Sequence, residues 1–317
     1  MKYSRILVTG STGFLGRHLV PELMKAFPDR TIIKASSADG DLTDFRQTIS
    51  LLEQSRPDAV VHLAAYSGGI GANRAWPADF YWRNITLVSN MFEACAQIGV
   101  KRIVYTMGGC SYPATSRSPI AESQMWAGYP QPDSAAYSSA KKMGIVAAEA
   151  YRAQHNIATT VLVPGNLFGE YDNFRIGESH VIPAFLRRFH EAKINGVDKV
   201  DCWGRGIAQR DFAYAADVAA LVPHFIDRED IGGPVNLSHG RATTIRELAE
   251  TVANVVGLQA ELNWLTDKPE GQLIKIFDVS MMRSLGWDCP TTLHAGLVKT
   301  YAWFERNFPE ASDGLRL

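Results

Sequence analysis

The sequence contains few cysteines, no long apolar run and almost no net charge. Only four of its 317 residues are cysteines, and no two form a CxxC pair, so we expect neither a disulfide framework nor a metal site. No stretch approaches the roughly 18 uninterrupted apolar residues of a membrane helix, and the start MKYSRILVTG has no small-residue cleavage site. Lys and Arg total 32 against 33 Asp and Glu, which excludes a global basic field for nucleic acid. We therefore expect a cytoplasmic protein without membrane or nucleic-acid partners, in which any anion meets a local site.

Apolar strand-like runs alternate with amphipathic segments along the first half of the chain. The length suggests about two structural units, and 46% hydrophobic with 21% charged residues is typical of a globular protein. The alternation predicts an α/β fold with a Rossmann-type doubly wound parallel sheet, about six or seven of its strands lying before about residue 220. The expected strands cover residues 5–9, 31–35, 59–64, 102–106 and 159–163, and the expected helices cover 17–25, 45–54, 85–97 and 136–154.

The pattern changes after Phe168. A cluster of Gly, Asp and Asn precedes an expected helix over 183–192 and a short strand over 199–203. We interpret this part as a smaller C-terminal substrate-binding lobe. The expected division is a Rossmann domain over residues 1–168 with returns near 213–238, and a lobe made mainly of 169–212 and 239–317.

A glycine-rich loop, GSTGFLG, separates the first expected strand from the first helix. Its glycines permit a tight turn and a close approach of the backbone to a pyrophosphate, which then lies on the partial positive charge of the helix N-terminus. Glycine loops also serve packing alone, but the position directly after the first strand favours a dinucleotide. The predicted contacts in this loop are Gly10, Thr12, Gly13, Phe14, Leu15 and Gly16.

The end of the second strand indicates which dinucleotide binds. NAD-binding proteins usually present Asp or Glu there to the ribose 2′-hydroxyl, whereas this chain has Lys34, Ser36 and Ser37. A cation and two hydroxyls suit a 2′-phosphate, so NADP is favoured over NAD, although Asp39 keeps NAD open. The segment GDLTD resembles the acidic position that holds the adenine amino group, with a solvated loop aspartate as the alternative; the residues concerned are Asp41 and Leu42.

Tyr137 and Lys141 lie four residues apart on an expected helix and therefore project from one face. An ammonium and the positive nicotinamide near a tyrosine would lower its pKa, so that its hydroxyl can exchange a proton with a substrate oxygen during hydride transfer. This YxxxK pair, combined with the glycine loop, resembles the extended short-chain dehydrogenases/reductases.

Longer segments resemble one branch of that superfamily, the GDP-L-fucose synthase family of GDP-4-keto-6-deoxymannose 3,5-epimerase-4-reductases. The resemblance covers nearly the whole chain. The segments that carry it are HLAAYSGGIGANRAWPADFYWRN, CSYP, AYSSAKKMG, NLFGEYDNF, SHVIPAFLRRFHEA, WGRGIAQRDF and KIFDV.

The resemblance implies an NADPH-dependent enzyme acting on a GDP-sugar, and a homodimer formed through helices such as 85–97 and 137–154. It implies that Cys110 and His180 transfer protons at C3 and C5 of a 4-ketosugar, with Tyr137 and Lys141 as the reductase pair. A ketone acidifies both neighbouring carbons, and inversion needs one group to remove a proton and another to return one. The remaining implied contacts are Ala64, Lys141 and His180 for the cofactor, and Asn166, Arg188, Trp203, Arg210 and Lys275 for the substrate.

The chain departs from the family at Gly108, where a serine or threonine hydroxyl normally joins the tyrosine in binding the 4-oxygen. Loss of one such donor can cost about 2.7 to 4 kcal/mol of transition-state stabilisation. Three alternatives follow: Ser111 or a water takes its place, the substrate carries a larger group, or the protein is a nucleotide-sugar C3/C5 epimerase with weakened or absent reductase activity. A related GDP-linked deoxysugar or heptose is a further alternative. A non-catalytic NADP-binding protein is disfavoured because Tyr137 and Lys141 are both present.

Overall fold

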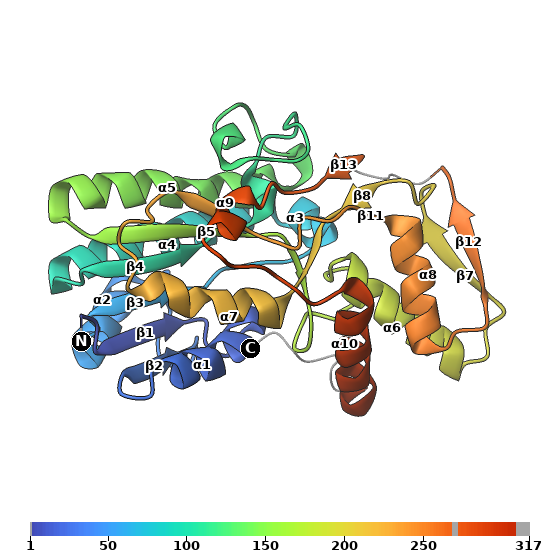
Figure 1. The fold of residues 1–317 in the computed structure, drawn as a ribbon, viewed down its shortest axis with the longest axis horizontal. Coiled ribbons are helices and arrows are strands. Elements are labelled where there is room, and N and C mark those ends of the chain that lie inside the picture. Colours follow the sequence, from blue (N-terminus) through green and yellow to red (C-terminus); the bar gives the residue numbers. More distant parts are fainter. Residues whose placement is uncertain (1, 268–271, 309–317) are drawn as a thin grey trace.

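The computed structural model describes residues 2–267 and 272–308 and contains a large parallel sheet (Figure 1). Its six strands lie in the order β10-β5-β4-β3-β1-β2, and every neighbouring pair is parallel. The chain runs outward from β1 to β2 and then crosses back to β3, so the topological switch point lies between β1 and β3. The strands are β1 (Arg5–Thr9), β2 (Thr31–Ala35), β3 (Ala59–His62), β4 (Arg102–Thr106), β5 (Ala158–Pro164) and β10 (Pro234–Leu237).

The predicted parallel sheet is confirmed, but the predicted number of strands before residue 220 is too high. Five of the strands precede that residue, and β10 is the sixth. Two short strands, β6 (Asn166–Phe168) and β9 (Phe212–Tyr214), pair with each other in a separate two-stranded sheet. They lead the chain away from the large sheet and back to it.

Helices cover the sheet in two layers. Helix α1 (Phe14–Ala26) packs against α7 (Ala215–Ile226), while α4 (Pro77–Ile98) packs between α2 (Phe45–Ser55) and α5 (Ala135–His155) (Figure 1). Because both faces are covered, the strands β3, β4 and β5 are buried at every residue. None of the helices within the described ranges is both long and apolar enough to cross a bilayer.

The smaller lobe has its own core around α6 (Val181–Ile194), α8 (Ile245–Val256) and α10 (Leu293–Asn307). This core includes Phe185, Leu186, Leu248 and Phe304. The segment around Phe277 and α9 packs with the larger core instead, although the sequence places 239–317 mainly in the smaller lobe. The other elements here are β7 (Lys199–Trp203), β8 (Gln209–Arg210), β11 (Thr243–Thr244), β12 (Glu261–Leu265), β13 (Ile274–Lys275) and α9 (Ser280–Ser284). Short connecting elements are α3 (Ile70–Ala75) and the 3₁₀ turns η1 (Gly109–Ser111), η2 (Glu122–Gln124) and η3 (Pro132–Ser134).

Candidate active site

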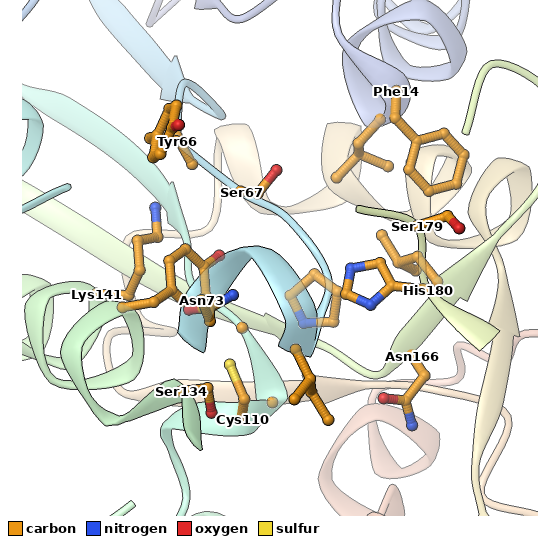
Figure 2. A pocket seen from close by; sticks show the side chains of 18 of the residues that line it. Phe14, Tyr66, Ser67, Asn73, Cys110, Ser134, Lys141, Asn166, Ser179 and His180 are labelled. Atoms are coloured by element: carbon orange, nitrogen blue, oxygen red, sulfur yellow. The ribbon is translucent and has the colours of Figure 1, made fainter. Parts of the chain in front are cut away.

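A cavity of about 1350 Å³ lies at the carboxyl ends of the large sheet's strands and continues into the smaller lobe. Figure 2 shows side chains around part of it, with Lys141, Cys110 and His180 arriving from three different elements. The predicted site residues that line it are Gly10, Thr12, Gly13, Phe14, Leu15, Gly16, Ser36, Ser37, Asp41, Leu42, Ala64, Cys110, Tyr137, Lys141, Asn166, His180, Arg188, Trp203, Arg210 and Lys275. Residues far apart in the sequence thus meet where open α/β sheets bind ligands.

The glycine loop forms the turn between β1 and α1. Gly10 has φ +67°, and a Cβ at Gly16 would lie 2.2 Å from the Gly10 carbonyl oxygen, so a side chain there would block the loop from folding onto the helix. Gly13 is the N-cap of α1 and provides no side-chain cap for the first amides of the helix. These amides and the helix dipole suit an anion, and the loop therefore fits a dinucleotide pyrophosphate.

Lys34 lines a second cavity of about 400 Å³ next to the large one, together with Arg17 and Ser36. Sequence reasoning missed Arg17, although its place one turn into the helix after a glycine loop is a usable signal. Its Nε donates to the Thr12 carbonyl oxygen at 2.7 Å. Asp39 also lines this cavity and accepts hydrogen bonds from the Ser36 amide and hydroxyl, which lower the pKa of Asp39. Two cations near the end of β2 suit a 2′-phosphate better than a lone hydroxyl.

Asp41 and Leu42 line the large cavity after the end of β2. One Asp41 carboxylate oxygen accepts from the amide and the hydroxyl of Thr43, while Leu42 is buried. The carboxylate is exposed, so the adenine role stays a prediction.

Tyr137 and Lys141 lie one turn apart on α5, as their spacing predicts. Lys141 is 2% exposed, and burial lowers its pKa to about 7, while Cys110 nearby opposes that shift. The Tyr137 ring packs edge-on against Phe80. The face of α5 that carries both residues therefore forms one wall of the cavity.

The side chains around Tyr137 do not by themselves lower its pKa. Burial raises this pKa, and the neighbouring Cys110 thiol adds to the shift. Desolvation penalises the phenolate, because the surrounding wall keeps water away from the charge. The hydroxyl therefore keeps its proton at neutral pH, which suits a proton donor.

Cys110 lies in η1, directly after β4, with its thiol beside Tyr137. A Cβ built on Gly108 would lie 3.1 Å from Cys110 Sγ and 3.6 Å from Tyr137 Oη. Ser111 faces away: it is fully buried, and its hydroxyl donates to the Ser138 carbonyl oxygen at 3.0 Å. The suggestion that Ser111 replaces the missing hydroxyl is therefore wrong.

His180 is the N-cap residue of α6 and faces the cavity from the other side (Figure 2). His180 is exposed, but the surface it exposes faces the cavity, whose walls limit the water around its ring. This restricted solvation lowers the pKa of His180, and the positive charge of Lys275 lowers it further. The segment before α3 holds this region in place, since the Gly69 amide donates to the Glu178 carbonyl oxygen at 2.7 Å. Sequence reasoning did not predict α3, which adds Asn73 to the cavity wall.

Two cations lie side by side in the lobe. Arg210 on β8 and Lys275 on β13 are direct partners in parallel strands, and burial lowers the pKa of each. Arg188 on α6 donates to the Asp201 carbonyl oxygen, and the Asn166 amide donates to the Asp211 carbonyl oxygen at 2.8 Å. Trp203 is 61% exposed and has room to contact a ligand. No cluster of metal-binding side chains occurs among the described residues.

Comparisons with known proteins agree with this architecture. The NAD dependent epimerase/dehydratase family matches residues 6–238. GDP-L-fucose synthase 1 of Arabidopsis thaliana is 38% identical over 96% of this chain and 94% of its own. A GDP-6-OMe-4-keto-L-xylo-heptose reductase from C. jejuni has a TM-score of 0.89 at 26% identity, covering 97% of this chain and 99% of its own.

A solved GDP-L-fucose synthetase from Naegleria fowleri bound to NADP has a TM-score of 0.87 at 26% identity, covering 97% of this chain and 94% of its own. The glycine loop, the YxxxK pair and the full-length likeness point the same way. The chain belongs to the NAD dependent epimerase/dehydratase family and, within it, to the GDP-L-fucose synthase family.

Proposed function

We propose that this protein is an NADPH-dependent epimerase-reductase of a GDP-linked 4-keto-deoxysugar. The observation that carries the proposal is that one cavity joins the glycine loop, the Tyr137 and Lys141 pair, and the two proton-transfer candidates Cys110 and His180. A binding protein would not need these four side chains around one space. The names of the relatives, GDP-L-fucose synthases and GDP-sugar reductases, support the same reaction class.

Epimerisation uses the thiol and the imidazole. The 4-ketone of the substrate acidifies the C–H bonds on both neighbouring carbons. One of Cys110 and His180 removes a proton, which leaves an enolate of the 4-ketone, and the other returns a proton on the opposite face of the ring. The lowered pKa of His180 keeps its imidazole neutral near pH 7, so that it can accept a proton or, after protonation, donate one.

Reduction uses the face of α5. When bound against this face, NADPH would supply the hydride for reduction at C4 of the sugar. Tyr137 donates its proton to the 4-oxygen as negative charge develops there, and its raised pKa keeps that proton available until then. Lys141 holds the nicotinamide ribose through its ammonium and makes the loss of the tyrosine proton easier.

The remaining predicted residues bind the two nucleotides. Arg210 and Lys275, partners on adjacent strands, suit the diphosphate of the sugar nucleotide because two cations side by side match its paired charges. We assign Arg188, Trp203 and Asn166 to the rest of the substrate. We also propose the division into two domains that accompanies these roles. The cofactor domain covers residues 1–168 with returns near 213–238, and the substrate lobe covers mainly 169–212 and 239–317.

We further propose a homodimer through α4 and α5. These helices lie side by side (Figure 1) and carry apolar side chains that a monomer leaves in water. Tyr81, Trp82 and Val146 on these helices are 51%, 53% and 46% exposed, and contact with a second copy would remove this apolar surface from water. Light scattering after size exclusion tests the assembly.

We also propose a cytoplasmic location, which suits the four free thiols. Cell fractionation tests it.

One experiment tests the function. The protein is incubated with GDP-4-keto-6-deoxymannose in deuterated water, with and without NADPH, while cofactor absorbance and product mass are followed together. Deuterium gain with NADPH loss supports the epimerase-reductase. Deuterium gain without NADPH loss indicates an epimerase alone, and NADPH loss without deuterium gain indicates a reductase alone. The absence of both deuterium gain and NADPH loss would refute the assignment for this sugar. A GDP-linked 4-ketoheptose is then the next substrate to assay.

A further inference from the structure

A buried tyrosine outside the cavity contacts Lys141 at both ends. Tyr105 is the penultimate residue of β4 and is 0% exposed. Its hydroxyl donates to the Lys141 carbonyl oxygen at 2.8 Å. The Lys141 Nζ lies 4.5 Å from the centroid of the same ring. One side chain therefore contacts both the backbone and the ammonium of Lys141.

A glycine on α5 leaves room for the Tyr105 ring. Gly144 lies three residues after Lys141, and a Cβ there would lie 2.2 Å from a ring carbon of Tyr105. A glycine inside a helix is less favourable than an alanine, so the position is kept free of a side chain at a cost in helix stability. The missing side chain leaves a slot in which the ring packs directly against α5. His62 stacks with the same ring at 5.9 Å between centroids, and Phe92 packs against it edge-on at 6.2 Å.

We propose that Tyr105 is a positioning residue that holds the Lys141 ammonium at the cofactor end of the cavity, with its ring face on the charge and its hydroxyl on the backbone of α5. This inference rests on the role proposed above for Lys141. A lysine has four rotatable side-chain bonds, and an aromatic face that attracts a cation restricts them before the cofactor arrives.

The surroundings of Lys141 make the ring important. Burial lowers the pKa of Lys141 to about 7, so a small loss of stabilisation removes its charge at neutral pH. The titratable groups around it are Tyr137 on α5, Cys110 in η1, His62 on β3 and Tyr105 itself. Burial lowers the pKa of His62 to about 3, and it raises that of Tyr137 and of Tyr105. These three groups are thus neutral at pH 7, whereas the ring quadrupole attracts the ammonium at every pH.

The test measures binding of NADPH alone, by fluorescence, between pH 6 and pH 9. Affinity should fall as pH rises through the pKa of Lys141, and Lys141→Met should lack that dependence. Tyr105→Leu removes the ring, so the midpoint should move down by about one pH unit. Tyr105→Phe keeps the ring and should retain the midpoint of the unmodified protein.

Phe225→Leu is the matched control, because it also truncates a buried aromatic ring of the larger core, but on α7 in the other helix layer. It should lose stability and keep the midpoint. If Tyr105→Leu is folded and its midpoint equals that of Phe225→Leu, the inference is wrong; the same holds if Lys141→Met retains the pH dependence. Should Tyr105→Leu fail to fold, Tyr105→Met carries the same comparison. No sugar is present, so a shifted midpoint in a protein that does not convert GDP-sugars would refute the proposed function and leave this inference standing.

Discussion

Restoring a hydroxyl at Gly108 tests how this site stabilises the 4-oxygen. The paired variants are Gly108→Ser and Gly108→Ala, which differ by one oxygen atom. A Cβ at this position lies 3.6 Å from Tyr137 Oη, so a hydroxyl on that Cβ can reach the oxygen that Tyr137 binds. We expect the serine variant to reduce the ketone faster than the alanine variant.

The cost of the new Cβ can be worked out from its contacts. It lies 3.1 Å from Cys110 Sγ, which is tight, but the sulfur ends a rotatable side chain. Displacing it from its rotamer costs about 0.5 to 1.5 kcal/mol. Gly108 has φ −100° and ψ 145°, which any residue adopts, so the substitution also stabilises the fold by about 0.4 to 1 kcal/mol through the unfolded chain. Both variants should therefore fold with stability within about 1 kcal/mol of the unmodified protein.

The benefit of the hydroxyl is larger than this cost. A well-placed oxyanion donor contributes about 2.7 to 4 kcal/mol, or a hundredfold or more in rate. Because the new hydroxyl lacks partners that fix its orientation, we expect a ratio of at least about tenfold between the serine and alanine variants. Both should lose part of the deuterium exchange, since both displace the Cys110 thiol.

The assay follows single-turnover NADPH oxidation with GDP-4-keto-6-deoxymannose, with deuterium incorporation measured in the same samples. Equal oxidation rates for Gly108→Ser and Gly108→Ala, in proteins of equal thermal stability, would refute the reasoning. A tenfold ratio in deuterium incorporation instead of NADPH oxidation would mean that the hydroxyl acts on Cys110 and not on the 4-oxygen.

Three further predictions concern separate parts of the site. Tyr137→Phe should abolish NADPH oxidation and leave measurable deuterium exchange, because the phenol serves only the reduction; unchanged turnover would contradict its role. Arg17→Ala should raise the KM for NADPH at least about tenfold with little effect on NADH, because the guanidinium lines the cavity next to Lys34; the matched variant Lys25→Ala, on the exposed part of α1, should change neither. Burial lowers the pKa of His62 from 6.5 to about 3. As the pH falls, the unfolded chain therefore binds a proton at His62 before the folded chain does, and the free energy of unfolding decreases between pH 6.5 and pH 3. The unfolding free energy of the native protein should therefore drop, relative to His62→Leu, by on the order of 4 kcal/mol over that window; parallel curves in denaturant titrations would show that this histidine is not held neutral.

Local patterns in the sequence were sufficient to predict the framework of this protein. The run RILVT becomes β1 and the glycine loop leads into α1, because strand burial and tight turns depend on neighbouring residues. The spacing of Tyr137 and Lys141 placed both on one face of α5, since helical periodicity repeats with little variation. The family likeness made Cys110 and His180 candidates for proton transfer, which no local pattern would single out, and the structure brings both to the cavity wall.

The tertiary structure decided what depends on the environment of each side chain. Burial raises the pKa of Tyr137, because the cost of desolvation depends on the whole surrounding wall. The 3₁₀ turn after β4 leaves Cys110 on the cavity and turns Ser111 into the core, although the two are adjacent in the chain. Strand register brought Lys275 beside Arg210. The slot opposite Gly144 placed Tyr105 against Lys141, since contacts between distant segments follow from packing and not from any local sequence pattern.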